Sequence, residues 1–176
     1  ATAQEQVATV TKKDVSKAPT FTPVTNDMLL KAGPKDGGKN WISYGRDYTN
    51  QRYSPLKQIH TQNVKNLKVS WIFQTGISRL GSFETSPIVV DGVMYVTTPY
   101  NTAMAVDART GKQIWRYEHK PSIASPIYCC GPNNRGVAIS EGTVYMATLD
   151  ARLLALDAAT GKVKWDIEVS DPEAGY

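Results

Sequence analysis

Histidine and cysteine are scarce in this sequence, and neither is spaced as a metal site requires. The 176 residues contain two histidines, His60 and His119, and two adjacent cysteines, Cys129 and Cys130. Zinc sites need several such ligands at set spacings, and no glycine-rich phosphate loop or Ser-His-Asp set can be assembled. We therefore predict no metal ligand and no catalytic residue within this chain, and we expect both histidines in surface loops.

Long apolar runs and clustered charge are missing as well. The most apolar region, residues 88–96, is interrupted by Asp91 and Gly92, whereas a membrane helix needs about 18 apolar residues or more. The net charge is +4 with a pI near 9.0, and lysines and arginines are scattered and not interleaved with stacking aromatics. We expect no membrane span and no nucleic-acid partner. The start at Ala1, without Met or an apolar segment, fits a mature chain after signal-peptide removal and equally a recombinant start.

Polar residues fill the first part of the chain, and short β-type runs fill the rest. We interpret residues 1–38 as an extended arm with one short helix over residues 27–31, capped by Asn26. Turn residues separate the later runs at intervals of about ten residues, which favours an all-β fold. The expected strands cover residues 68–74, 86–90, 93–98, 103–106, 113–118, 136–140, 143–148, 153–156 and 163–169.

An internal repeat is the most informative feature: residues 91–117 recur as residues 141–167 at an offset of 50 without a gap. The Asp of the shared Asp-x-x-Thr-Gly turn can accept hydrogen bonds from backbone N–H groups, and its Gly supplies a positive φ. The Trp four residues later is large enough to pack against a neighbouring unit. Asp and Trp are therefore assigned structural roles. The shared positions include Gly92/Gly142, Tyr95/Tyr145, Ala105/Ala155, Asp107/Asp157, Thr110/Thr160, Gly111/Gly161 and Trp115/Trp165.

A four-stranded unit of this kind cannot bury its faces alone, so copies must stack. A period near 50 favours a β-propeller, with a linear β-solenoid or a sandwich carrying a duplicated hairpin as alternatives. Because propellers have at least about four blades, we expect the remainder of the ring as further residues or as another chain.

The unit Ala-x-Asp-x-x-Thr-Gly-x-x-x-Trp resembles the tryptophan-docking motif of the quinoprotein dehydrogenases, which use pyrroloquinoline quinone (PQQ). Trp41–Ile59 is similar to that family's opening segment, and Asn63–Trp71 to its first strand. The resemblance runs from about Trp41 to the end. It implies an eight-bladed β-propeller in the complete protein, with an arm (1–38) and about two blades (39–176) here. It also implies a periplasmic alcohol dehydrogenase that oxidises alcohols to aldehydes or ketones and passes electrons to cytochrome c.

The resemblance gives the cysteines a role. In the family, adjacent cysteines form a disulfide against one face of the quinone, and an Arg five residues later contacts its oxygens; these are Cys129, Cys130 and Arg135 here. Neighbouring Cα atoms lie about 3.8 Å apart, below the usual disulfide range of about 4.4–6.8 Å. Such strain tends to occur at functional sites, and a disulfide implies an oxidising compartment. The alternative is two reduced, buried thiols.

The resemblance also assigns Glu84, before the first inner strand, to a cofactor carboxylate or pyrrole edge. The alternative is a solvated loop carboxylate. A Ca²⁺ or lanthanide ion would polarise the quinone carbonyl, and the resemblance places its ligands and the general-base Asp beyond residue 176. Two other functions stay open: a non-enzymatic propeller with docking repeats that acts as an assembly scaffold, and an extracellular carbohydrate-binding propeller.

Overall fold

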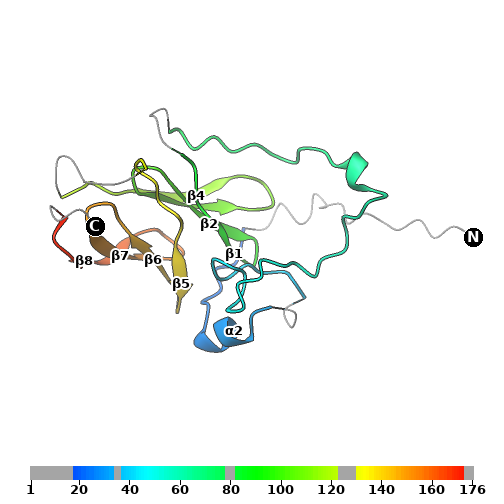
Figure 1. Cartoon of the computed structure of the whole chain (residues 1–176), viewed down its shortest axis with the longest axis horizontal. Helices are drawn as coiled ribbons and strands as arrows, with labels where there is room; N and C mark the ends of the chain where they lie inside the picture. The colour runs from blue at the N-terminus through cyan, green and yellow to red at the C-terminus, as the bar shows by residue number, and fades with distance from the viewer. Residues whose placement is uncertain (1–17, 34–36, 78–81, 123–129, 173–176) are drawn as a thin grey trace, which may run out of the picture.

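The computed structural model describes residues 18–33, 37–77, 82–122 and 130–172. Within this part, eight strands form two four-stranded antiparallel sheets in the orders β1-β2-β3-β4 and β5-β6-β7-β8 (Figure 1). Two short helices precede them, α2 (Asn26–Lys31) and η2 (Val64–Asn66). The all-β prediction is confirmed. Neither of these helices has the length and hydrophobicity that crossing a membrane would require.

Each copy of the sequence repeat supplies the last three strands of one four-stranded sheet. The first contains β1 (Ile88–Val90), β2 (Val93–Thr98), β3 (Thr102–Asp107) and β4 (Gln113–Glu118). The second contains β5 (Ala138–Ser140), β6 (Thr143–Ala147), β7 (Arg152–Asp157) and β8 (Val163–Glu168). Both sheets shift register at the equivalent point, after Ala105 and after Ala155. The repeated sequence therefore gives a repeated backbone, including its irregularity.

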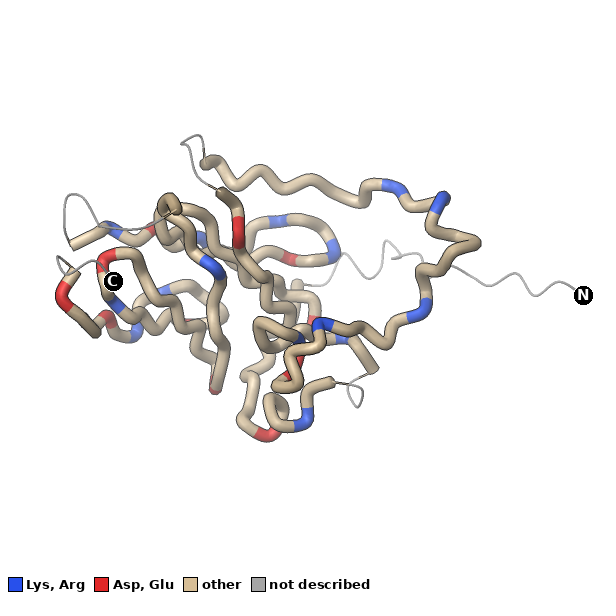
Figure 2. The backbone as a smooth tube through the Cα atoms, in the orientation of Figure 1, with Lys and Arg blue, Asp and Glu red and all other residues tan. Residues whose placement is uncertain are grey.

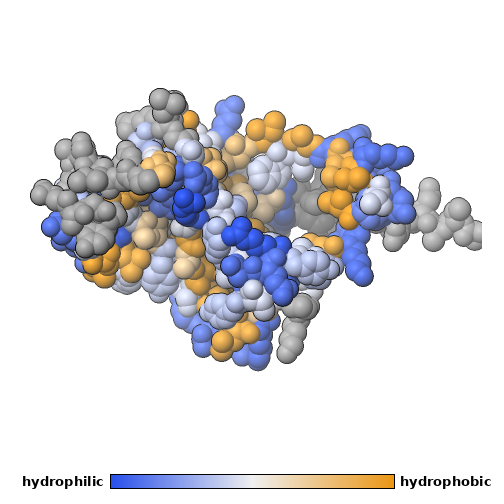
Figure 3. Space-filling view, viewed as in Figure 1, coloured by the Kyte–Doolittle hydropathy of each residue, from blue (hydrophilic) through white to orange (hydrophobic). Residues whose placement is uncertain are grey.

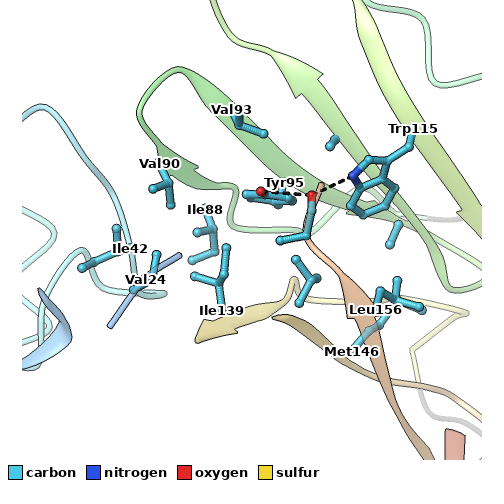
Figure 4. Packing of buried hydrophobic residues seen from close by; sticks show 14 of the residues in the cluster. Val24, Ile42, Ile88, Val90, Val93, Tyr95, Trp115, Ile139, Met146 and Leu156 are labelled. Carbon is cyan, nitrogen blue, oxygen red and sulfur yellow. Dashed lines mark hydrogen bonds between the residues drawn. The ribbon is translucent and has the colours of Figure 1, made fainter. Parts of the chain in front are cut away.

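The indole of Trp115 on β4 joins the two sheets. Its Nε1 donates a hydrogen bond of 2.9 Å to the carbonyl of Ala158 in the β7–β8 turn, and the Tyr95 hydroxyl donates to the same carbonyl at 3.2 Å (Figure 4). Gly161 in that turn has φ 70°, and a Cβ there would lie 2.7 Å from the indole ring. The turn needs glycine for its backbone and for the space that the ring occupies. The predicted packing role of this Trp is confirmed.

Trp71 makes the same contact with the first sheet. Its Nε1 donates to the carbonyl of Ala108 at 3.0 Å, and a Cβ on Gly111 would lie 2.7 Å from its ring. In the same turn the Asp107 carboxylate accepts from the backbone N–H of Arg109 at 2.9 Å, as predicted for this Asp. The docking contact thus occurs twice within the described residues.

Apolar side chains from both sheets and from the N-terminal segment form one core (Figure 4). Val24 is fully buried in it, and its carbonyl accepts from the Glu141 N–H at 2.8 Å. The predicted short helix is present as α2, but its N-cap is Thr25, whose side chain accepts from the backbone of Met28, and not Asn26. The division of the chain at residue 38 stays a prediction.

The predicted strand over residues 68–74 is not formed within the described structure. This segment runs along the outside of the molecule as an extended chain, and no described strand pairs with it. Val69 and Ile72 are 78% and 81% exposed, and apolar side chains mark this part of the surface (Figure 3). The sequence has the alternation of a strand, but a strand also needs a hydrogen-bonding neighbour.

Candidate functional site

The candidate site lies where β1 and β5, the first strands of the two sheets, begin. Ser86 and Gly136 form a parallel bridge there, and the Ser86 N–H donates to the carbonyl of Arg135 at 3.1 Å. Gly136 has φ 127°, and a Cβ at this position would lie 2.9 Å from the Ser86 carbonyl oxygen. Glycine therefore permits the close approach of the two segments. The approach brings Glu84, two residues before Ser86, beside Arg135.

Glu84 and Arg135 form an ion pair with 2.9 Å between Oε2 and Nη1, and their side chains are 34% and 69% exposed. The Asn133 amide connects this pair to the cysteine segment: its Nδ2 donates to Glu84 Oε1 at 2.9 Å and to the Cys130 carbonyl at 2.9 Å. The structure thus brings together Glu84, Cys130 and Arg135. Cys129 lies outside the described residues.

The backbone at Cys130 has a left-handed conformation. Its φ is 62°, and that of the following Gly131 is 97°. A non-glycine residue in this region is uncommon and is found at sites where the surroundings enforce it. The Asn133 N–H donates to the Gly131 carbonyl at 2.8 Å, which closes a tight turn. The Cys130 residue itself is exposed.

Hydrogen bonds from buried polar groups join this turn to both sheets. Asn134 is 6% exposed, and its Nδ2 donates to Asn101 Oδ1 at 3.0 Å and to the Ala147 carbonyl at 2.9 Å. The Tyr100 N–H donates to the Pro132 carbonyl at 3.0 Å. The segment from Cys130 to Arg135 is therefore bonded to the β2–β3 turn of the first sheet and to β6 of the second.

Tyr44 belongs to the same neighbourhood, although sequence reasoning did not select it. The Arg52 guanidinium carbon lies 4.5 Å from the centroid of its ring. Hydrogen bonds with Arg52 and Ser86, and the positive charges of Arg52 and Arg135, lower the pKa of the Tyr44 hydroxyl. Both Tyr44 and Asn133 were missed because their roles depend on contacts with residues distant in sequence. The only local signal was the position of Tyr44 within the Trp41–Ile59 segment.

His119 is buried, which corrects the expectation of a surface loop. It is 8% exposed, and its Nε2 donates to the Asp150 carboxylate at 2.9 Å. Burial acts to raise the pKa of Asp150, but hydrogen bonds from Thr148, the Ser122 backbone and His119 outweigh it and hold that pKa below its ordinary value. The pair lies 31 residues apart in sequence. His60 is half-buried in a turn, where its backbone N–H donates to Asn63 Oδ1 at 2.8 Å.

Potential metal ligands do not gather in the part of the chain that the structure describes: no group of three or more His, Cys, Asp or Glu side chains there could hold an ion. What the site offers is one guanidinium, one carboxylate, one amide and the cysteine turn. Such a set can bind an anionic or oxygen-rich planar molecule.

The chain resembles known dehydrogenases in sequence. Residues 41–166 match the family described as PQQ: glucose/ethanol/alcohol dehydrogenase, β-propeller domain. The 1-butanol dehydrogenase (cytochrome c) of Thauera butanivorans is 45% identical over 115 residues, which are 65% of this chain and 16% of that protein.

Solved structures agree with this match. A quinohemoprotein alcohol dehydrogenase, ADHIIG from Pseudomonas putida HK5, superposes with a TM-score of 0.75 at 40% identity, over 84% of this chain and 22% of that one. A europium-containing methanol dehydrogenase superposes with a TM-score of 0.73 at 37% identity, over 83% and 25%. The two sheets are thus two blades of a β-propeller. The chain spans only 16% to 25% of the length of these relatives.

Proposed function

We propose that the complete protein is a PQQ-dependent alcohol dehydrogenase, because this chain belongs to the PQQ family of glucose/ethanol/alcohol dehydrogenase β-propeller domains. Its substrate is an alcohol, and its product is an aldehyde or ketone. The observation that carries the proposal is the convergence of Glu84, Asn133 and Arg135 on the turn that begins at Cys130. Residues 49 positions apart meet there, and the docking of the blades does not require these side chains.

The polar groups of the site fit an oxygen-rich planar cofactor. The Arg135 guanidinium is 69% exposed while one nitrogen contacts Glu84, so its remaining N–H groups can donate to carboxylate or quinone oxygens. Glu84 orients that guanidinium. Within the described residues, the Oδ1 atom of Asn133 is buried and has no hydrogen-bond partner, which leaves an acceptor beside the cluster. We assign Glu84 and Arg135 to cofactor binding on these grounds.

Cys129 and Cys130 complete the proposed site as a disulfide between neighbours. Three observations support it. The sequence has only these two cysteines, the described residues contain no free cysteine, and Cys130 has the φ of 62° that a strained turn would impose. The sulfur pair would form a flat, polarisable wall against the cofactor ring. Because disulfides persist in oxidising compartments, the same proposal places the protein in the periplasm.

When bound, PQQ would accept the electrons of the alcohol, with a Ca²⁺ or lanthanide ion polarising its carbonyl. Arg135 would donate hydrogen bonds to its oxygens and stabilise negative charge there, and the cysteine wall would exclude water from one face. The europium in the methanol dehydrogenase named above supports a lanthanide as one choice of metal. We propose that the metal ligands and the general base lie beyond residue 176.

Cytochrome c is the proposed electron acceptor. The name of the butanol dehydrogenase relative supports it. The chain also offers a basic stretch to an acidic partner: between Asp47 and Glu84 the sequence has no acidic residue, and the described part of that stretch carries Arg52, Lys57, Lys65 and Lys68 (Figure 2). A surface of one sign can steer a partner of the opposite sign.

Reconstitution of the complete protein tests the proposal. The purified protein is incubated with PQQ and either Ca²⁺ or a lanthanide, and quinone absorbance and alcohol-dependent dye reduction are measured. We expect bound quinone and dye reduction that requires both the alcohol and a metal. A folded protein that binds no quinone would contradict the proposal and would favour an assembly scaffold, which needs the docking turns but not the Glu84–Arg135 cluster.

A further inference from the structure

A buried His–Asp pair lies between the two blades, close to the candidate site. The side chains of His119 and Asp150 are 3% and 0% exposed. Asp150 Oδ1 accepts from His119 Nε2 at 2.9 Å and from Thr148 Oγ1 at 2.6 Å, and Oδ2 accepts from the Ser122 N–H at 2.6 Å. Since Nε2 faces only carboxylate oxygens, it carries a proton. Both carboxylate oxygens are satisfied, as a buried charge requires.

The pair is not part of what the two repeats share. At the offset of 50, His119 corresponds to Val169, and Asp150 corresponds to Tyr100. The backbone contact at this place is common to both blades, because the His119 N–H donates to the Asn101 carbonyl at 3.2 Å and the Val169 N–H to the Ala151 carbonyl at 2.9 Å. The backbone contact that closes a blade therefore forms without a His–Asp pair, and the pair at 119 and 150 is an additional contact between the two blades.

The pair reaches the candidate site through two asparagines. The backbone N–H of His119 donates to the carbonyl of Asn101 at 3.2 Å, and Asn101 Oδ1 accepts from the Asn134 side chain at 3.0 Å. Asn134 stands next to Arg135 in the sequence, and its Oδ1 accepts from the Gly136 N–H at 3.1 Å. Every link of this route is buried: His119, Asp150, Asn101 and Asn134 are each at most 8% exposed.

We propose that the His119–Asp150 pair is a positioning unit for the cofactor site: through Asn101 and Asn134 it holds the segment Cys130–Arg135 in the orientation that meets the quinone. The inference rests on the proposed function for the identity of the cofactor, but not for the contacts themselves. Among the described residues, no bond joins His119 or Asp150 directly to Glu84, Cys130 or Arg135. Removing the charge at 150 releases the imidazole of His119, and the inference is that the His119 backbone transmits this movement to Asn101 and Asn134.

Hydrogen exchange of the complete protein, followed by mass spectrometry, tests the mechanical half of the inference. Asp150→Asn replaces one carboxylate oxygen with an NH2 group, which faces a donor and can no longer accept its hydrogen bond. Peptides covering residues 130–137 should therefore exchange about tenfold faster. His119→Gln keeps a donor for Asp150 and should stay within about twofold of the unchanged protein. Asp166→Asn is the matched control, because it removes the carboxylate that pairs with Arg152 at 2.7 Å in the same blade, and it should affect only β7 and β8, which that ion pair joins.

Binding of PQQ, followed by absorbance titration of the same proteins with Ca²⁺ present, tests the functional half. Asp150→Asn should raise the dissociation constant about tenfold, while His119→Gln and Asp166→Asn should leave it near that of the unchanged protein. Unchanged exchange at 130–137 in Asp150→Asn, equal acceleration in every strand, or unchanged quinone affinity would overturn the inference. If the unchanged protein binds no quinone, the proposed function fails, and the exchange data still decide whether the pair holds the segment.

Discussion

The contact between the blades can be tested by adding a single methyl group. Gly161 has φ 70°, and a Cβ there would lie 2.7 Å from the Cδ2 and Cε3 atoms of Trp115. The indole cannot withdraw freely, because its Nε1 is bonded to the Ala158 carbonyl in the same turn at 2.9 Å. Gly161→Ala therefore forces the turn or the indole to move, and the bond between the blades weakens.

The size of the effect follows from two separate costs. A residue with a Cβ in the left-handed region costs about 1–2 kcal/mol, and overpacking adds about 1–3 kcal/mol. Gly142→Ala is the matched control: Gly142 has φ 67°, but a Cβ there would lie 3.9 Å from its nearest neighbour, a carbon of Pro23. The control has the backbone cost alone, so the difference between the two variants measures the docking contact.

Urea denaturation of the complete protein compares the two variants. At equal m-values, the midpoint of Gly161→Ala should lie below that of Gly142→Ala by the equivalent of about 1–3 kcal/mol. Equal midpoints would show that the indole does not occupy the space above the turn, and the account of how the blades join would then be wrong.

Three further changes test other parts of the structure. Trp115→Phe removes the N–H donor together with the five-membered ring of a buried indole, so it should lower the free energy of unfolding by about 1–3 kcal/mol; an unchanged free energy of unfolding in the same urea assay would contradict this. The pKa of Asp150 is lowered in the folded state, so its stabilisation is complete above the unfolded value of about 3.9 and is lost as the pH falls below it. Melting temperatures of the unchanged protein and Asp150→Asn should therefore converge in acid, and a constant gap down to about pH 2 would contradict the assignment. Changing both Cys129 and Cys130 to Ala should leave the melting temperature nearly unchanged but impair quinone retention or alcohol-dependent dye reduction; unaltered turnover would remove the cysteines from the mechanism.

Local sequence signals predicted the blades well. The docking turns depend on residues close in the chain: Asp107 accepts from the N–H of Arg109 at 2.9 Å, and Gly111 supplies φ 71°. The repeat at an offset of 50 then gave the second blade from the first. Such features can be predicted because a hydrogen bond across two residues is determined by the residues themselves.

Contacts between distant residues explain what the sequence did not reveal. His119 is buried at a contact with Asp150 of the next blade, 31 residues away in the sequence. Asn133 resembles a solvated loop residue until the approach of Ser86 and Gly136 brings Glu84 within 2.9 Å of it. The expected strand over residues 68–74 is absent for the same reason, since a strand needs a hydrogen-bonding neighbour and no described strand pairs with this segment.

The central claim is that the turn from Cys130 to Arg135 forms one wall of a PQQ site, and a quinone titration of Arg135→Ala in the complete protein tests it most directly. Losing a charged hydrogen-bond donor should raise the dissociation constant about tenfold or more. Arg109→Ala is the control, because this arginine also pairs with a carboxylate, Asp107, at 2.9 Å, but at the opposite end of the first blade. We predict weakened quinone binding in Arg135→Ala alone; equal affinity in both variants and the unchanged protein would contradict the account.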